Sequence, residues 1–393
     1  MSRIIEDKVI NFITHLPSNA NPYQAAADCL ATFLLPYPLP SWSRYLQRVY
    51  AVTFLMMFFQ SIYVLYVRSK TKRLYHIGLN SMGLLQLDRA NHCGLCYFLY
   101  SIIALSEIIC EELVQSGQLD QGWPNFLLGI KLTLTVICAR VILWLCICHC
   151  ALDALRRKNQ RGQVLSKTVT WAMNTFLVII LFAPAVQIII SFYQVTMEYQ
   201  HIRKMVTGII DIYRDLAPSC SLVKCSVTQT IPQLVSHWSV LHHVDLLEYY
   251  TTLGSDSYLF ICGIVLLVYV PFLFLLSRSF NDQEGLESSL KKQQEGVFSN
   301  TLLEFTIILL LLILVSCETS LVHKGDFIYN SSFWLISRIG IGGVISTLGN
   351  TALFLILCSL YRTNLAHQDT HIVMPEIPVP VAVYHKSSEE VSV

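Results

Sequence analysis

Four charged residues lie inside segments that are otherwise apolar, and they are the first candidates for chemistry in this chain. They are Glu107, Lys131, Glu318 and Arg338. An ionisable group at the centre of a bilayer costs at least about 2.5 kcal/mol on insertion scales, so such groups pair with one another or serve a function. Two acids and two bases at similar depth predict a polar pocket that binds a ligand. The alternative is structural ion pairing, with the long side chains reaching toward the interface.

A second pair of charges lies deeper in the apolar segments. Arg140 falls near the middle of one segment, and Glu304 precedes Glu318 in another. If these two helices touch, an ion pair between Arg140 and Glu304 would lock one half of a helix bundle, and its separation would act as a switch. A permanently locked structural pair is the alternative interpretation.

Cysteines form two groups with different expected chemistry. Cys220 and Cys225 are close enough in sequence to close a small disulfide loop in an oxidising compartment, with Cys29 as a competing partner. Cys146, Cys148 and Cys150 crowd one end of an apolar segment. Thiols at the cytoplasmic boundary are common acylation sites, and inert burial is the alternative.

Two sets of residues have the composition of a metal site. Two cysteine-containing segments on neighbouring helices could give a tetrahedral zinc site from Cys93, Cys96, Cys148 and His149. The other set lacks the spacing of known metal motifs and is interpreted as surface residues: His237, His242, His243, Asp245 and Glu248. Lipidation or inert burial is the favoured interpretation of the first set, so no metal and no cofactor are predicted.

The elements that carry these residues are seven long apolar segments. The hydrophobic fraction is 54%, only 13% of residues are charged, and the mean hydropathy is +0.52. A helix needs about 20 apolar residues to cross a hydrocarbon core. The segments that meet or approach this length are residues 48–67, 93–111, 126–148, 169–193, 257–277, 301–318 and 333–361. They predict an all-α membrane protein built as a seven-transmembrane helix bundle in a lipid bilayer.

Basic residues predict which ends face the cytosol, because cytoplasmic loops collect Lys and Arg. The first and third loops are rich in both, with Arg68, Lys70, Lys72 and Arg73 in one and Arg156, Arg157 and Lys158 in the other. The second and sixth loops are nearly free of them. We therefore expect the amino terminus outside and the carboxyl terminus inside. The sequon that begins at Asn330 then lies in an external loop and predicts glycosylation.

Three regions follow from this topology. Residues 1–47 form an extracellular arm with no ordinary signal peptide, residues 48–361 form the bundle, and residues 362–393 form a disordered cytoplasmic tail. Residues 194–256 make a long external loop between the fourth and fifth spans. Apolar residues recur at helical spacing from Tyr193 to Leu216, which predicts a helical extension in this loop.

The arrangement resembles that of G-protein-coupled receptors over residues 48–361, in architecture only. The third span ends in Cys146-Ile147-Cys148-His149-Cys150 rather than an acidic-Arg-Tyr triplet. The sixth has no Trp-x-Pro, and the seventh contains Asn350-Thr351-Ala352 without the family's Pro and Tyr. Insect chemoreceptors share the number of spans but have the opposite orientation.

The resemblance implies a receptor in the plasma membrane that senses an extracellular ligand and signals to a cytoplasmic protein by helix movement. A non-catalytic scaffold is the main alternative, followed by a transporter. A transporter with two equal halves would show internal repeats, which the sequence lacks. We expect no enzymatic activity and no nucleic-acid partner, because no catalytic spacing stands out.

Overall fold

The computed structural model describes residues 11–12, 15–16, 20–34, 41–70, 78–79, 83–157, 167–220, 239–281, 288–323 and 335–373. Nearly all of these residues are helical. The helices are α2 (Pro22–Leu34), α3 (Ser41–Lys70), α4 (Arg89–Gln115), α5 (Gly122–Arg157), α6 (Lys167–Leu216), α8 (Ser239–Asn281), α9 (Ser288–His323) and α11 (Ile341–Val373). A π-helical turn, η2 (Leu335–Gly340), leads into α11, and a 3-10 turn, η1 (Ala217–Ser219), follows α6.

Seven of these helices are long and apolar enough to cross a membrane, which confirms the all-α, seven-span prediction. The candidate spans are Trp42–Lys70, Arg89–Gln115, Gly122–Ala151, Lys167–Ser219, His242–Arg278, Phe298–His323 and Ile336–Tyr361. Each contains one of the predicted segments almost entirely. The protein is therefore a multi-pass membrane protein by the length and composition of its helices.

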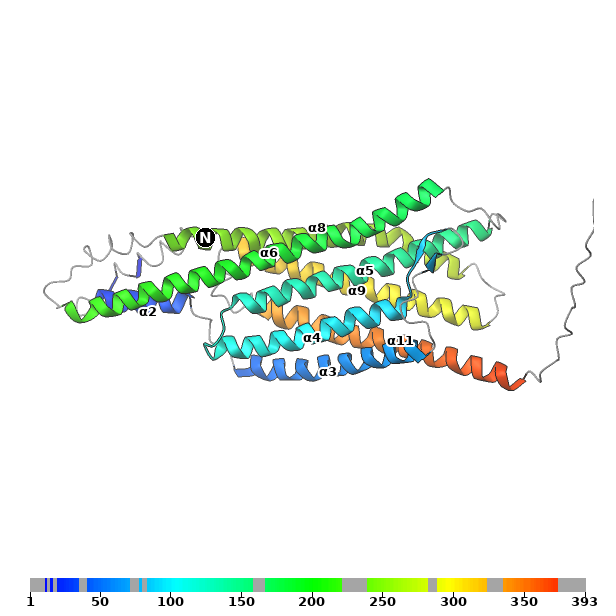
Figure 1. The fold of residues 1–393 in the computed structure, drawn as a ribbon, viewed down its shortest axis with the longest axis horizontal. Coiled ribbons are helices and arrows are strands. Elements are labelled where there is room, and N and C mark those ends of the chain that lie inside the picture. The colour runs from blue at the N-terminus through cyan, green and yellow to red at the C-terminus, as the bar shows by residue number, and fades with distance from the viewer. Residues whose placement is uncertain are drawn as a thin grey trace, which may run out of the picture.

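The helices run alternately up and down along the long axis of the molecule (Figure 1). One end holds the turn between α4 and α5 together with α2, the end of α6 and the start of α8, and we call it the cap end. The other end holds the end of α3, the start of α4 and the start of α6, and we call it the hairpin end. A residue near the start of a long helix and a residue near its end therefore lie at opposite ends of the molecule.

Helix α5 lies at the centre of the bundle, where it packs against α4, α6, α8 and α9. Small residues permit close approach. A Cβ atom on Gly129 of α5 would lie 2.5 Å from the Phe192 ring of α6, so only glycine fits there. A Cβ atom on Gly349 of α11 would lie 3.0 Å from the Tyr97 ring and 3.2 Å from the Met57 sulfur, which is tighter than an ordinary contact.

At the cap end, α2, α6 and α8 share a separate apolar cluster. Its buried members include Tyr23 and Ala26 of α2, Tyr213 of α6 and Leu247 of α8. Helix α6 continues to Leu216, and α8 begins at Ser239, so both helices extend beyond the predicted spans 169–193 and 257–277. The apolar periodicity that continues past residue 193 is thus buried by helix packing rather than exposed.

At the hairpin end, the first loop is fixed onto α5 and α6. Strands β1 (Gly78–Leu79) and β2 (Leu85–Gln86) form a two-residue antiparallel pair. Trp144 Nε1 of α5 donates a hydrogen bond to the carbonyl of Leu85 at 2.9 Å. Asn174 of α6 accepts from the Leu85 amide and donates to the Gly83 carbonyl. These bonds satisfy backbone groups that would otherwise be exposed or unpaired.

Helix α11 continues to Val373, so the first residues of the predicted tail 362–393 are helical. Residues 374–393 lie outside the described residues, as does Asn330. In the arm 1–47, the same holds for residues 1–10, 13–14, 17–19 and 35–40.

Candidate functional site: a buried charge network

Two spanning helices, α4 and α5, and the η2 turn place charged side chains together in the interior near the cap end. Glu107 and Glu111 come from α4, Lys131 from α5 and Arg338 from η2. All four residues are at least nine-tenths buried. The structure thus brings together three of the four residues whose charge predicted an outer pocket.

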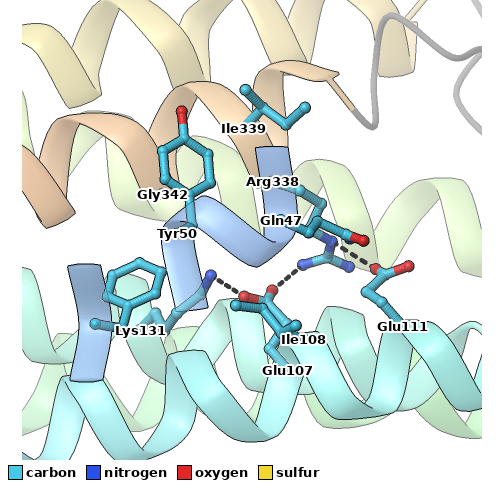
Figure 2. Close-up of a pocket in the computed structure, with 10 residues that line it drawn as sticks. Gln47, Tyr50, Glu107, Ile108, Glu111, Lys131, Arg338, Ile339 and Gly342 are labelled. Atoms are coloured by element: carbon cyan, nitrogen blue, oxygen red, sulfur yellow. Dashed lines mark hydrogen bonds and ion pairs between the residues drawn. The ribbon is translucent and has the colours of Figure 1, made fainter. Parts of the chain in front are cut away.

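Glu107 lies at the centre of this network, as Figure 2 shows. Lys131 Nζ donates to Glu107 Oε2. Arg338 Nη1 donates to the other oxygen, Glu107 Oε1, at 2.5 Å. One carboxylate therefore joins two cations from two other elements, so removing it would leave both cations without their shared partner.

Arg338 extends the network beyond Glu107. Its Nε atom lies 3.0 Å from Glu111 Oε1, and its Nη2 atom donates to Asn125 Oδ1 of α5. The planar guanidinium can make these contacts at once because its donors are fixed in a fork. Replacing it by lysine would keep the charge but lose the geometry.

Glu318 of α9 lies near the network but pairs differently from the prediction. It is 1% exposed, and its Oε2 atom has no hydrogen-bond partner among the described residues. Arg338 and Lys131 are close enough to interact with it electrostatically. With Glu107 and Glu111, the network holds three carboxylates against two cations, so it is one positive charge short of neutrality when every group is ionised.

A cavity of about 20 Å³ lies between the network and α3. Gln47, Tyr50 and Phe54 of α3 line this cavity together with Ile339 and Gly342. Figure 2 shows Gln47 and Tyr50 beside the charged side chains. This volume suits about one water molecule. A larger ligand would fit only if α3 or η2 moved.

Sequence reasoning missed Glu111 and Asn125. Glu111 follows Glu107 by one helical turn and therefore shares its face, a signal that could have been found. Asn125 has no charge and lies at the start of a span, where a polar residue is ordinary. Asn125 is recognised as part of the network only because Arg338 lies beside it in the structure.

The predicted pair between Arg140 and Glu304 is not formed in this structure. Arg140 Nη1 donates instead to the carbonyl of Ile180 in α6. Pro184 lies four residues after Ile180 and has no amide hydrogen, so that carbonyl lacks its usual helical donor. Glu304 accepts a hydrogen bond from Tyr97 at 2.7 Å. The arginine thus compensates for a proline, and the switch hypothesis has no pair to separate in this conformation.

The cysteines proposed for acylation lie mainly inside the bundle. Cys146 and Cys148 are buried, and Cys150 is partly exposed. Cys146 and Cys150 thiols each lie 3.9 Å from the Phe272 carbonyl of α8. Acylation remains a prediction, and Cys150 is the most accessible of the three.

Cys220 is disulfide-bonded, and its predicted partner Cys225 lies outside the described residues. The competing candidate, Cys29, is a free thiol in α2. Burial raises the pKa of the Cys29 thiol to about 11. Cys29 therefore stays protonated and poorly nucleophilic at neutral pH.

The cysteines considered as zinc ligands do not come together in the expected set. Cys93 and Cys96 belong to the central core, whereas Cys148 packs with Trp144 and Leu177 at the hairpin end. The potential metal-ligand atoms that lie close to the Cys93 sulfur belong instead to Cys138 and Glu304.

Taken together, the fold and the buried ion pairs define a multi-pass helical membrane protein with a polar network inside its bundle. Comparison with protein-family models, with curated proteins and with solved structures finds no match for this chain. Its function must therefore be inferred from its own residues.

Proposed function

We propose that the protein is a cell-surface receptor whose ligand acts on the buried charge network at the cap end. The observation that carries this proposal is the convergence of Glu107, Lys131 and Arg338 from three elements, beside Glu318, whose Oε2 atom has no hydrogen-bond partner in the described part of the chain. Buried charges are expensive in a bundle that apolar residues could fill, so a functional role accounts for their presence.

The charge of the network supports a cationic ligand, such as a protonated amine. When every group is ionised, three carboxylates against two cations leave an unbalanced negative charge, and Glu318 Oε2 has no hydrogen-bond donor among the described residues. A positively charged group beside Glu318 would supply both the donor and the charge. The electrostatic attraction would be strong in this interior, where no bulk water screens it.

The small cavity supports coupling between binding and helix movement. The present space holds about one water, so a ligand must displace the α3 residues Gln47 and Tyr50 or the η2 turn. Helix α11 follows η2 directly and runs to the hairpin end. Movement of η2 would thus reach the basic first and third loops, where a cytoplasmic signalling protein would respond.

The disulfide at Cys220 supports an external location of the cap end, because such bonds persist in oxidising compartments. That location agrees with the excess of Lys and Arg in the first and third loops at the other end. Both features favour the plasma membrane with the amino terminus outside.

The compact packing of the network favours a second candidate, a non-catalytic membrane scaffold. In a scaffold the ion pairs would only hold α4, α5 and η2 together, and no ligand would enter. The two candidates differ in what a change at Glu318 does, because Glu318 makes no direct ion pair with any residue that the structure describes.

The test uses cells that express the full chain and a panel of amines, carboxylates and sugars, with intracellular calcium and membrane current as readouts. We expect a response to a cationic compound that weakens at least tenfold in Glu318→Gln, with unchanged surface expression. Lys204→Met, an exposed position on α6, is the matched control and should respond normally. An equal response in Glu318→Gln would contradict the proposed site, and flux of the compound across the membrane would favour a transporter.

A further inference from the structure

A second group of polar side chains lies deeper in the bundle, separate from the charge network. The thiols of Cys93 and Cys138 and a carboxylate oxygen of Glu304 all lie within 4.8 Å of one another. They come from α4, α5 and α9, and each residue is at most 3% exposed. Glu304 precedes Glu318 by 14 residues on α9, or about 20 Å along the helix axis.

We propose that Cys93, Cys138 and Glu304 bind a zinc ion that joins α4, α5 and α9. Zinc takes cysteine sulfur at about 2.3 Å and carboxylate oxygen at about 2.0–2.2 Å in a tetrahedral arrangement. Ligand atoms in such a site are about 3.5–3.8 Å apart by that geometry. Donors within 4.8 Å thus need a closure of about one ångström, which side-chain rotation can supply.

Cys96 is the fourth ligand in this proposal. It lies one turn after Cys93 on α4 and, with Cys138 and Glu304, lines a small cavity of about 10 Å³. Its thiol interacts with that of Cys138. The site would then be closed by four protein ligands, as structural zinc sites usually are.

The surroundings provide positive charge to balance the ligands. Arg89 interacts electrostatically with Cys93 and Glu304. His92 Nε2 lies 3.4 Å from the Cys96 sulfur. Three thiolates and one carboxylate carry four negative charges, of which Zn²⁺ and Arg89 would neutralise three, and an Nε2–H of His92 would donate a hydrogen bond to the Cys96 sulfur. Burying an otherwise uncompensated anion would be costly.

The hydrogen bond from Tyr97 to Glu304 orients the carboxylate. Tyr97 donates to Glu304 Oε1 at 2.7 Å, and Cys138 Sγ lies 4.0 Å from the same oxygen. Outer hydrogen bonds of this kind fix the orientation of metal ligands. The mixed sulfur and oxygen set favours Zn²⁺ over Mg²⁺ or Ca²⁺, which prefer oxygen alone, and over Cu⁺, which prefers sulfur alone.

The test measures metal bound to the purified full chain in lipid nanodiscs, after chelation and re-equilibration with Zn²⁺. We expect one zinc per wild-type chain by mass spectrometry and at least a tenfold loss of affinity in Cys138→Ser. Cys317→Ser, an exposed cysteine on α9, is the matched control and should bind normally. Equal zinc affinity in the wild type and Cys138→Ser would overturn the proposal.

If the variants fail to fold, X-ray absorption at the zinc edge still tests the proposal, because it needs only the wild-type protein. We expect a first shell with sulfur at about 2.3 Å and one oxygen near 2.0–2.2 Å. A shell of nitrogen and oxygen alone, or a wild type without zinc, would overturn the assignment. Neither result bears on the ligand response of the Glu318→Gln variant, so the two proposals fail independently.

Discussion

Replacing Lys131 by methionine tests the buried charge network most sharply. The side chain keeps most of its length, but the ammonium that donates to Glu107 Oε2 is lost. Both residues are buried, with 1% and 5% exposure. Breaking a buried ion pair by removing one partner costs about 3–5 kcal/mol, because the other charge stays behind. We expect a loss of that size in Lys131→Met and in Glu107→Gln.

The double variant makes this prediction quantitative. Lys131→Met with Glu107→Gln removes one charge of each sign, so the net charge of the network is unchanged. Residues in one network are coupled by about 0.5–3 kcal/mol, and the double loss should fall short of the sum of the single losses by an amount in the upper part of this range. Arg338 retains Glu111 and Asn125 as partners in the double variant.

The assay is reversible unfolding in mixed detergent micelles, followed by circular dichroism. The control combines Lys131→Met with Trp144→Phe on the same helix. These residues lie 13 positions apart, or about 20 Å along α5, so their losses should add. Additive losses for Lys131 and Glu107 as well would refute the assignment of a shared ion pair.

Three further predictions concern other contacts. Arg140→Met should destabilise the protein by about 1.5–3 kcal/mol in micellar unfolding. The loss should be smaller in a Pro184→Ala background, because the restored amide would donate a hydrogen bond to the Ile180 carbonyl. Equal losses in both backgrounds would contradict this role of Arg140. Gly129→Ala should cost about 1–3 kcal/mol by overpacking, whereas Gly208→Ala, with open space around it, should be neutral or stabilising on thermal denaturation. If Gly208→Ala were destabilised as well, helix packing would not be the cause of the loss in Gly129→Ala. The raised pKa of Cys29 should make maleimide labelling slow at pH 7 and faster only as the pH approaches about 11. The neutral buried thiol also stabilises the fold below its unfolded pKa, and this contribution is lost as the pH rises through about 11. Labelling at pH 7 as fast as in a denaturant would contradict the burial.

Hydropathy was enough to predict the seven spans, because a bilayer admits only segments that satisfy their own backbone. The same argument identified Lys131, Glu107 and Arg338, since a charge within such a segment must find a partner. Their common location could be predicted from depth alone. Their pairing could not, because it depends on how far each helix is rotated about its axis.

The partner of Arg140 shows a different limit. From the sequence, Pro184 predicts that the Ile180 carbonyl lacks its helical hydrogen-bond donor. Which helix supplies another donor is known only from the packing of α5 against α6. Cys138 likewise has no neighbouring ligand in sequence. Its role in the zinc proposal depends on the meeting of three helices, which no local spacing encodes.

The orientation of the whole chain in the membrane is the central claim, and epitope tags at both ends test it most directly. Antibodies applied to intact cells should bind an amino-terminal tag and reach a carboxyl-terminal tag only after permeabilisation. Binding of both tags in intact cells, or of the carboxyl-terminal tag alone, would contradict seven crossings with an external cap end.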